Sequence, residues 1–405
     1  MIPYGRQSID ADDIAAVARA LQSDYLTTGP MVEAFEQAFA EAVGAKYAVA
    51  VSHGTAALHL AMLVAGIGSG DRVVTSPNTF LASANCAAMV GAIPDFVDIE
   101  PNSQNMDPAA LRAQWKPDVK AVVAVDYAGR PANMPEISEI AHSRGAIVIE
   151  DACHALGSRF QVNGKTYSVG GHSWADITTY SFHPVKTITS GEGGMLVTNN
   201  KAFADRARLL RSHGIVRDPD AMIGFGRLSA ASSGSWVYEM QELGFNYRLS
   251  DLHCALGRNQ LLKLEKFTSR RREIVNDYNN AFRDLEYLNT PEIDVTSFTS
   301  DFSLEPDTIS WHLYTLQIDF TALQITRAEV MQKLRDKGIV TQVLYVPVYW
   351  QPWYEKTYGY KVGKCPQAES CYGKSLSLPL FYDLGTKDLK QVIDTISGLC
   401  APILG

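Results

Sequence analysis

Short apolar runs alternate with amphipathic stretches along the first half of the chain. Runs rich in β-branched residues predict strands at residues 46–54, 72–77, 92–98, 119–126 and 146–153. Between them, apolar residues recur at helical spacing at residues 55–66, 79–91, 107–115 and 134–145. Strands that alternate with helices favour parallel β-α-β units with helices on both faces. This part of the chain is therefore expected to form an α/β sheet domain.

The pattern continues with two further expected strands, 174–182 and 193–200, and a helix over 201–214 that a glycine ends. The sheet should therefore extend to about residue 200. Residues 216–241 are rich in Gly, Ser and Ala without periodicity, which predicts a mobile loop or insertion. Apolar residues then recur at helical spacing over residues 249–282 and predict one long amphipathic helix.

Length and composition agree with two globular domains. The chain has 405 residues, of which 46% are hydrophobic and 20% are charged, enough for cores that fold unaided. We expect a large α/β domain with an N-terminal segment at residues 1–249 and a smaller α+β domain at 250–405. No apolar run approaches the ~20 residues of a membrane span, and the N-terminus lacks the apolar core of a signal peptide. A cytoplasmic protein without a membrane partner is expected.

Charge and ligand spacing argue against two classes of function. The net charge is −8 and the basic cluster Arg270–Arg272 is isolated, so nucleic acid is not an expected partner. The six cysteines contain no C-x-x-C pair, which gives no signal for a zinc site or a disulfide framework. His53 and His59 do not have the i, i+4 spacing that places two ligands on one helix face. No bound metal is expected.

Polar residues follow the expected strands at the sheet edge where ligands of open α/β sheets bind. The backbone N–H groups of Gly54, Thr55 and Ala56 lie at a predicted helix start and can bind an anion, although such residues also simply cap helices. Asp151 ends a buried strand, where it either meets a cationic or hydrogen-bonding group or caps a helix. Phe80 offers a ring face for stacking or is ordinary core.

Lys186 stands among small residues in the segment SFHPVKTITSGEGG, residues 181–194. It is either a solvated loop residue or a desolvated lysine, whose lowered pKa makes the neutral amine a nucleophile. An anion-binding helix start, a strand-end carboxylate, an aromatic face and such a lysine are the parts that pyridoxal 5′-phosphate requires. A nicotinamide cofactor is not expected, because no strand is followed by G-x-G-x-x-G, and no P-loop occurs.

Seven motifs extend this interpretation over nearly the whole chain. In order they are LTTGP, SHGTAAL, PNTFLASAN, DACHALGS, SFHPVKTITSGEGG, RSHGI and GFNYRLSDLHCALG. Together they resemble the DegT-type sugar aminotransferases, which are fold-type I pyridoxal-phosphate enzymes acting on nucleotide-linked keto-sugars. The resemblance implies a mixed, mostly parallel sheet flanked by helices, and a homodimer with shared active sites.

Within that family, His154 and the motifs AVDYAG, HLY and YVPVYWQ resemble one subgroup, which acts in pseudaminic acid biosynthesis. The resemblance implies transfer of an amino group from L-glutamate to C4 of a UDP-linked 4-keto-6-deoxy-N-acetyl hexose. Another C4 or C3 sugar aminotransferase of the family is an alternative, as is a non-catalytic regulator that kept the fold. Dehydratase relatives, which replace the lysine by histidine, are disfavoured because Lys186 is present.

The family's cofactor-binding residues carry over to matching positions. Lys186 matches the Schiff-base lysine, Asp151 the partner of the ring nitrogen, and His154 the residue beside the ring hydroxyl. The implied phosphate contacts are Thr55, Ala56, Ser181 and, from the neighbouring subunit, Asn246. Phe80 is the expected aromatic partner of the ring.

The resemblance also implies residues that contact the nucleotide-sugar. They are Tyr4, Tyr25, Leu26, Thr27, Thr28, His312 and Tyr314. Tyr4 and Tyr25 are equally consistent with interface aromatics. Glu192 is expected to support the lysine by a hydrogen bond, and His183 is either a support or a substrate contact. The segment 216–241 is longer than the family pattern requires, which leaves substrate contacts from that side open.

Overall fold

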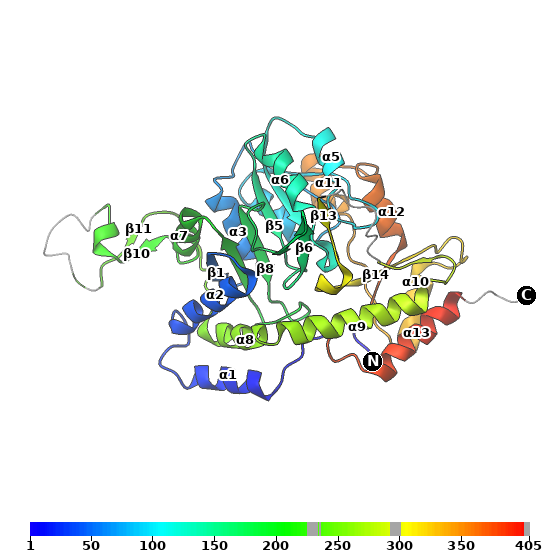
Figure 1. Ribbon diagram of the computed structural model, residues 1–405. Helices are drawn as coiled ribbons and strands as arrows, with labels where there is room; N and C mark the ends of the chain where they lie inside the picture. The colour runs from blue at the N-terminus through cyan, green and yellow to red at the C-terminus, as the bar shows by residue number, and fades with distance from the viewer. Residues whose placement is uncertain (225–233, 235, 292–300, 401–405) are drawn as a thin grey trace, which may run out of the picture.

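A seven-stranded sheet forms the centre of the molecule (Figure 1). The computed structural model describes residues 1–224, 234, 236–291 and 301–400. The strands are, in spatial order, β1 (Tyr47–Val51), β9 (Gly194–Thr198), β8 (Ile177–Ser181), β5 (Ile147–Asp151), β4 (Val119–Val125), β2 (Arg72–Thr75) and β3 (Ile93–Phe96). β9 is antiparallel to both neighbours and the other pairs are parallel. The prediction of a mixed, mostly parallel sheet that ends near residue 200 is confirmed.

Helices cover both faces of this sheet, because side chains alternate along each strand. On β1, Val49 and Val51 pack with α3 (Gly54–Val64) and α7 (Lys201–Leu210), whereas Ala48 and Ala50 pack with α2 (Pro30–Val43). The other helices over the sheet are α4 (Ala82–Met89), α5 (Pro108–Ala113) and α6 (Met134–His142). The predicted β-α-β pattern thus becomes a three-layer arrangement.

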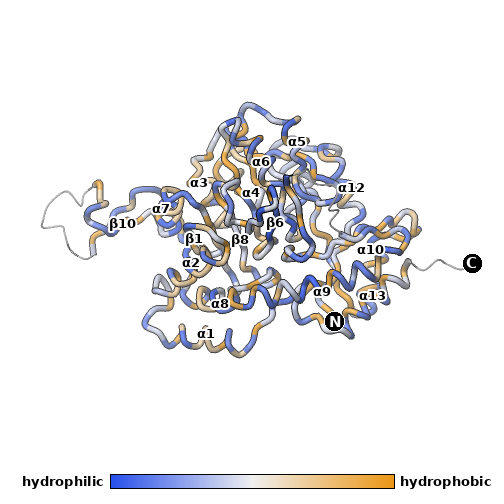
Figure 2. The backbone as a smooth tube through the Cα atoms, viewed as in Figure 1, coloured by the Kyte–Doolittle hydropathy of each residue, from blue (hydrophilic) through white to orange (hydrophobic). Residues whose placement is uncertain are grey.

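The long helix predicted over residues 249–282 is instead two helices, α8 (Asp251–Leu261) and α9 (Leu264–Phe282). The prediction was wrong at the junction, where Lys263 places its ammonium group 2.9 Å from the buried carboxylate of Asp13 on α1 (Ala11–Leu21). Periodicity does not reveal such a break when both halves keep an apolar face. Figure 2 shows alternating hydrophobic and hydrophilic bands along α8 and α9, as expected of amphipathic helices.

The rest of the chain adds two small sheets and four longer helices. One sheet has the order β12 (Leu288–Asn289), β14 (Tyr314–Ile318), β15 (Ser375–Leu378), and the other β13 (Phe302–Ser303), β6 (Arg159–Val162), β7 (Lys165–Ser168). The helices are α10 (Arg327–Asp336), α11 (Pro352–Tyr358), α12 (Pro366–Lys374) and α13 (Thr386–Cys400). Short 3₁₀ helices lie at η1 (Tyr127–Gly129), η2 (Pro219–Ala221), η5 (Pro306–Thr308) and η6 (Val348–Trp350).

One hydrophobic cluster joins α9 and the sheet β12–β14–β15 to α2 and the main-sheet strand β8. The division into domains at residue 249 therefore stays a prediction. Among the described residues, none of the helices combines the length and apolar character that crossing a bilayer requires.

The segment predicted as a loop over 216–241 begins and ends as a two-stranded ribbon, β10 (Ile215–Val216) paired with β11 (Glu239–Met240). The ribbon projects from the side of the molecule (Figure 1). Residues 225–233 and 235, on which much of the mobile-loop prediction falls, lie outside the described residues. The described ends differ from the prediction because a pairing of two residues per strand is too short to give a sequence pattern.

Strand β3 is an edge of the main sheet, and residues 348–368 cover it. The ring of Phe96 on β3 packs against Tyr349, Tyr354 and Tyr360, with ring centroids 5.6, 5.7 and 5.5 Å away. An uncovered edge strand is a template for pairing with other chains. The covering segment follows directly after Tyr345, which lines the site described below.

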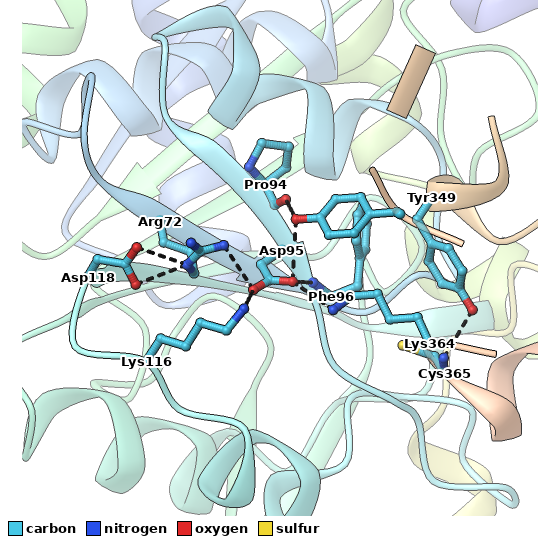
Figure 3. Close-up of polar contacts among 10 residues, drawn as sticks. Arg72, Pro94, Asp95, Phe96, Lys116, Asp118, Tyr349, Lys364 and Cys365 are labelled. Atoms are coloured by element: carbon cyan, nitrogen blue, oxygen red, sulfur yellow. Dashed lines mark hydrogen bonds and ion pairs between the residues drawn. The ribbon is translucent and has the colours of Figure 1, made fainter. Parts of the chain in front are cut away.

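The Asp95 carboxylate binds three cations from three parts of the chain (Figure 3). One of them, Lys364, belongs to the covering segment and so connects it to β3. The Asp95 oxygens lie 3.0 Å from Arg72, 2.6 Å from Lys116 and 2.9 Å from Lys364. Burial alone would raise the pKa of Asp95, but hydrogen bonds from the two lysines lower it to about 2. The 4% exposed carboxylate is therefore charged and paired.

Candidate active site

A cavity of about 400 Å³ lies where the main-sheet strands β4, β5 and β8 end. Ligands of open α/β sheets bind at this end of the strands. The cavity brings together the predicted site residues Tyr4, Thr55, Phe80, Asp151, His154, Ser181, Lys186 and His312. His183 and Glu192, for which the sequence left the roles open, line it as well. Most of the predicted cofactor site is thus assembled in one place.

Lys186 lies in a tight loop between β8 and β9, and it lines the cavity. Its backbone N–H donates to the His183 carbonyl at 2.8 Å, and that of Ser190 donates to the Phe182 carbonyl at 3.1 Å. The Nζ of Lys186 lies 3.4 Å from Nε2 of His312. Burial lowers the pKa of the Lys186 amine, because the charged form loses its hydration. The lysine is a desolvated amine rather than a solvated loop residue.

The glycines after Lys186 let the chain return beneath the start of α3. Gly191 has a φ of +82°, a left-handed conformation that glycine adopts without strain. A Cβ on Gly194, the first residue of β9, would lie 2.5 Å from the carbonyl carbon of His53. Between them, the carbonyl of Glu192 accepts a hydrogen bond from Ser190 Oγ at 2.7 Å. A support from the Glu192 side chain to the lysine stays a prediction.

Helix α3 begins at Gly54, beside the end of β8. Within the described ranges, no side chain caps its first N–H groups. A Cβ on Gly54 would lie 2.9 Å from the Cβ of Ser181, so the helix start and this hydroxyl are in close contact. Thr55 lines the cavity, and Ala56 lies next along the helix and is buried. Free N–H groups at a helix start bind anions, so this corner suits a phosphate.

Asp151 ends β5 and is 5% exposed. Its Oδ2 accepts a hydrogen bond from Ser83 Oγ at 2.6 Å, and its Oδ1 accepts one from the Cys153 backbone N–H at 3.2 Å. The next element is strand β6, so the alternative that Asp151 caps a helix is wrong. These two bonds fix the carboxylate at the cavity wall and leave it lone pairs for a ligand.

His154 connects two other segments at the same wall. The Ala128 backbone N–H donates to its Nδ1 at 3.3 Å, and its Nε2 lies 3.2 Å from the Tyr345 hydroxyl oxygen. Because a backbone N–H can only donate, Nδ1 is an acceptor and the ring proton is on Nε2. Burial, and then the charge of Lys186, lowers the pKa of His154. The ring is therefore neutral and donates to Tyr345.

Some predicted residues lie away from the cavity. Tyr314 is fully buried, with its hydroxyl donating to Asn279 at 2.9 Å, so the prediction that it contacts a nucleotide-sugar was wrong. Tyr25 and Leu26, with Thr27 and Thr28, precede α2 and do not line the cavity. Asn246 is exposed and forms a β-bridge with Ser212. Contacts from residues 25–28, and from Asn246 to a second subunit, stay predictions.

The sequence interpretation missed Ser83, Cys153 and Tyr345, which line the cavity. Ser83 follows Phe80 by three residues within PNTFLAS, which is about one helical turn. This spacing could have indicated that the Ser83 hydroxyl lies on the same side as the Phe80 ring. Tyr345 belongs to the motif YVPVYWQ, and its ring stacks on His154 with centroids 6.1 Å apart and planes at 19°. No local pattern connects these two residues, so only the fold reveals the contact.

The residues at the cavity fit pyridoxal 5′-phosphate. An uncapped helix start, a strand-end carboxylate and a desolvated amine suit its phosphate, ring nitrogen and aldehyde, respectively. Phe80 is 56% exposed and lines the cavity, which leaves its ring available for packing. Nε2 of His312 lies at Lys186, whereas its Nδ1 is buried without a hydrogen-bond partner in the described part of the chain.

Comparisons with known proteins agree with this geometry. Residues 7–397 match the DegT/DnrJ/EryC1/StrS aminotransferase family. The chain is 39% identical over 396 residues to the spore coat polysaccharide biosynthesis protein SpsC of Bacillus subtilis, covering 98% of this chain and 96% of that protein. It is 39% identical over 399 residues to a UDP-4-amino-4,6-dideoxy-N-acetyl-β-L-altrosamine transaminase of Campylobacter jejuni, again covering 98% and 96%.

A solved structure supports the same conclusion. Helicobacter pylori PseC, an aminotransferase involved in the biosynthesis of pseudoaminic acid, superposes with a TM-score of 0.85 at 28% identity, covering 98% of this chain and 99% of that one. The predicted aminotransferase fold is therefore confirmed. The chain belongs to the DegT/DnrJ/EryC1/StrS family and is a sugar aminotransferase that uses pyridoxal 5′-phosphate.

Proposed function

We propose that this enzyme transfers an amino group from L-glutamate to C4 of UDP-2-acetamido-2,6-dideoxy-β-L-arabino-hex-4-ulose, a UDP-linked 4-keto-6-deoxy sugar, in cytoplasmic pseudaminic acid biosynthesis. The observation that carries the chemistry is the cavity that gathers Lys186, Asp151 and the start of α3. The 39% identity with the Campylobacter jejuni transaminase and the likeness to PseC support the choice of sugar.

Lys186 is the proposed catalytic residue. Its amine would hold the cofactor through the aldehyde carbon until the amino donor takes its place. Pyridoxal 5′-phosphate supplies a ring that accepts electrons from the donor's α-carbon. The freed Lys186 amine accepts the proton of that α-carbon and, in the second half of the reaction, delivers a proton to C4 of the sugar. The lowered pKa of Lys186 suits this task, because only the unprotonated amine is a base or a nucleophile.

The other cavity residues bind and orient the cofactor. Asp151 holds a proton on the ring nitrogen, and Ser83 fixes the carboxylate by its 2.6 Å hydrogen bond. His154 would lie beside the ring hydroxyl, and Phe80 would pack on the ring. The proposed phosphate contacts are Thr55, Ala56, Ser181 and, from a second subunit, Asn246. The site is therefore proposed to be shared in a homodimer.

The nucleotide-sugar is proposed to approach over the open side of the cavity. Tyr4 and His312 line the cavity itself and are the proposed contacts nearest to the sugar. Residues 25–28, at the N-terminal side of α2, are the proposed contacts further out. Because residues 25–28 do not line the cavity within this chain, their contacts are proposed for the bound state or for the site of a second subunit.

A panel of nucleotide keto-sugars tests the proposal. The purified protein is incubated with L-glutamate and UDP- or dTDP-linked 3-keto and 4-keto sugars of different configuration, and amino-sugar products are measured by mass spectrometry. The UDP-linked substrate named above should be turned over fastest, and Lys186→Ala should give no product above background. Faster turnover of another keto-sugar would contradict the choice of substrate, and no product from any of them would contradict the reaction.

The equal identity with SpsC favours one second candidate. That protein is named for spore coat polysaccharide biosynthesis, so a different nucleotide keto-sugar of polysaccharide assembly is the alternative acceptor. The same panel distinguishes the two, because the cavity chemistry is shared and only the preferred sugar differs.

A further inference from the structure

The adjacent arginines Arg270, Arg271 and Arg272 have different surroundings on α9. Arg270 and Arg272 form ion pairs with partly exposed carboxylates, of Glu273 at 2.8 Å and Glu265 at 2.5 Å. Arg271 is 2% exposed, and no carboxylate in the described ranges of the chain pairs with it. Burying a charge without an anionic partner destabilises the fold. The position of Arg271 therefore suggests a functional role.

Arg271 ties two segments near the active site to α9. Its Nη1 donates to the Leu380 carbonyl at 3.0 Å and lies 3.4 Å from the carbonyl oxygens of Trp311 and His312. Trp311 and His312 precede β14, and Leu380 follows β15. Burial lowers the pKa of Arg271 to about 10, so the guanidinium is still charged at neutral pH.

His312 connects this arginine to the reactive lysine. Its backbone N–H donates to the Ala128 carbonyl at 2.9 Å, and its Nε2 lies 3.4 Å from Nζ of Lys186. Two titratable groups contact its ring, Lys186 and His154, whose ring centroid lies 4.4 Å away. Arg271 on α9 and His183 after β8 also act on its pKa. All of them are cationic or neutral, and none can compensate a positive charge on the imidazole.

We propose that Arg271 is a positioning residue of the active site, which fixes the His312 backbone so that the imidazole contacts the Lys186 amine and which keeps that imidazole uncharged. The inference rests on the proposed role of Lys186 as the amine that takes the substrate proton. When Lys186 becomes an ammonium group, a neutral ring with its proton on Nδ1 accepts a hydrogen bond at Nε2. A charged ring would repel the ammonium group at the same distance.

The electrostatic surroundings agree with this role. Burial lowers the pKa of His312, and the neighbouring Lys186, His154 and Arg271 lower it further. Removing the guanidinium removes its positive charge and its 3.4 Å contact with the His312 carbonyl oxygen. The imidazole should then take up a proton at higher pH.

The test is the pH dependence of hydrogen exchange at the imidazole C–H of His312, measured by mass spectrometry on the full-length protein without cofactor. In the wild type and in the matched control Arg272→Met, the midpoint should lie well below the ordinary histidine pKa of about 6.5. In Arg271→Met the midpoint should rise above that of Arg272→Met. Arg271→Gln keeps an amide donor for the carbonyls but lacks the charge, and should give a similar rise.

Turnover provides a second readout for the same variants. Misplacement of His312 should lower kcat by about 10- to 100-fold in Arg271→Met, with a smaller effect on KM. An unchanged His312 midpoint in whichever of the two Arg271 variants folds would overturn the proposal and leave Arg271 a purely structural residue. The exchange measurement uses neither cofactor nor substrate, so its failure is distinguishable from a failure of the proposed function in the sugar panel.

Discussion

Replacing Asp95 by Asn removes the charge that Arg72, Lys116 and Lys364 share at the edge of the main sheet, while the size of the side chain is kept. Asn resembles the protonated carboxyl, so the cost can be worked from the pKa. The pKa of Asp95 is about 2 in the folded chain, against about 3.9 in an unfolded one. Each pKa unit corresponds to about 1.4 kcal/mol, so the charged form stabilises the fold by about 2–3 kcal/mol.

The pH dependence of this stabilisation has a definite sign. Because folding lowers the pKa of Asp95, the stabilisation is fully present above about pH 4 and is lost as the pH falls towards 2. Urea unfolding followed by circular dichroism should therefore give Asp95→Asn a deficit of about 2–3 kcal/mol at pH 7. The deficit should shrink steadily between pH 4 and pH 2.

A neighbouring carboxylate provides the control. Asp118 binds Arg72 at 3.0 Å, but its side chain is 40% exposed, so Asp118→Asn should cost less than about 1 kcal/mol. If the deficit of Asp95→Asn were the same at pH 7 and at pH 2.5, charge pairing at Asp95 would not be its cause.

Three further predictions concern the cavity. Gly54→Ala should weaken cofactor binding at least about tenfold in an absorbance titration, because its Cβ would lie 2.9 Å from Ser181; wild-type affinity would show that the helix start does not hold the phosphate. Lys186→Ala should lack the near-visible absorbance of covalently bound cofactor and lose about 10²- to 10⁴-fold or more in turnover; an unchanged spectrum would exclude Lys186 as the attachment point. Tyr345→Phe removes the acceptor of the 3.2 Å bond from His154. The free energy of unfolding in urea should fall by about 1–3 kcal/mol, and an unchanged value would mean that this bond is not made.

The sheet and much of the cavity were predictable because both follow from local patterns. Parallel strands alternate with helices, and the carboxyl ends of neighbouring strands meet at one edge, so Asp151 and Ser181 come together. Lys186 follows a few residues after one of these strand ends. The antiparallel direction of β9 was not encoded in a comparable way, because the same alternation of side chains serves either direction.

The errors have equally specific causes. The resemblance placed both His312 and Tyr314 at the nucleotide-sugar, but His312 precedes β14 and Tyr314 begins it, so the two side chains have different surroundings. Tyr314 is directed to the core and His312 to the cavity. The contacts of Ser83 with Asp151, and of Tyr345 with His154, join segments far apart in sequence. Such contacts depend on the packing of the whole chain, which no single segment reveals.

The cover over strand β3 also has a consequence during synthesis. The Asp98 carboxylate, two residues beyond β3, accepts a hydrogen bond from the Gln367 backbone N–H, which is 269 residues away in sequence. At translation rates of about 5–20 residues per second, the edge strand emerges roughly 15 to 50 s before its cover. During that interval the nascent chain exposes an unpaired strand edge, and a fragment that stops before residue 348 keeps this edge exposed permanently. Such fragments are expected to self-associate, so the segment from residue 348 onward protects the edge of a sheet whose strands are synthesised long before it.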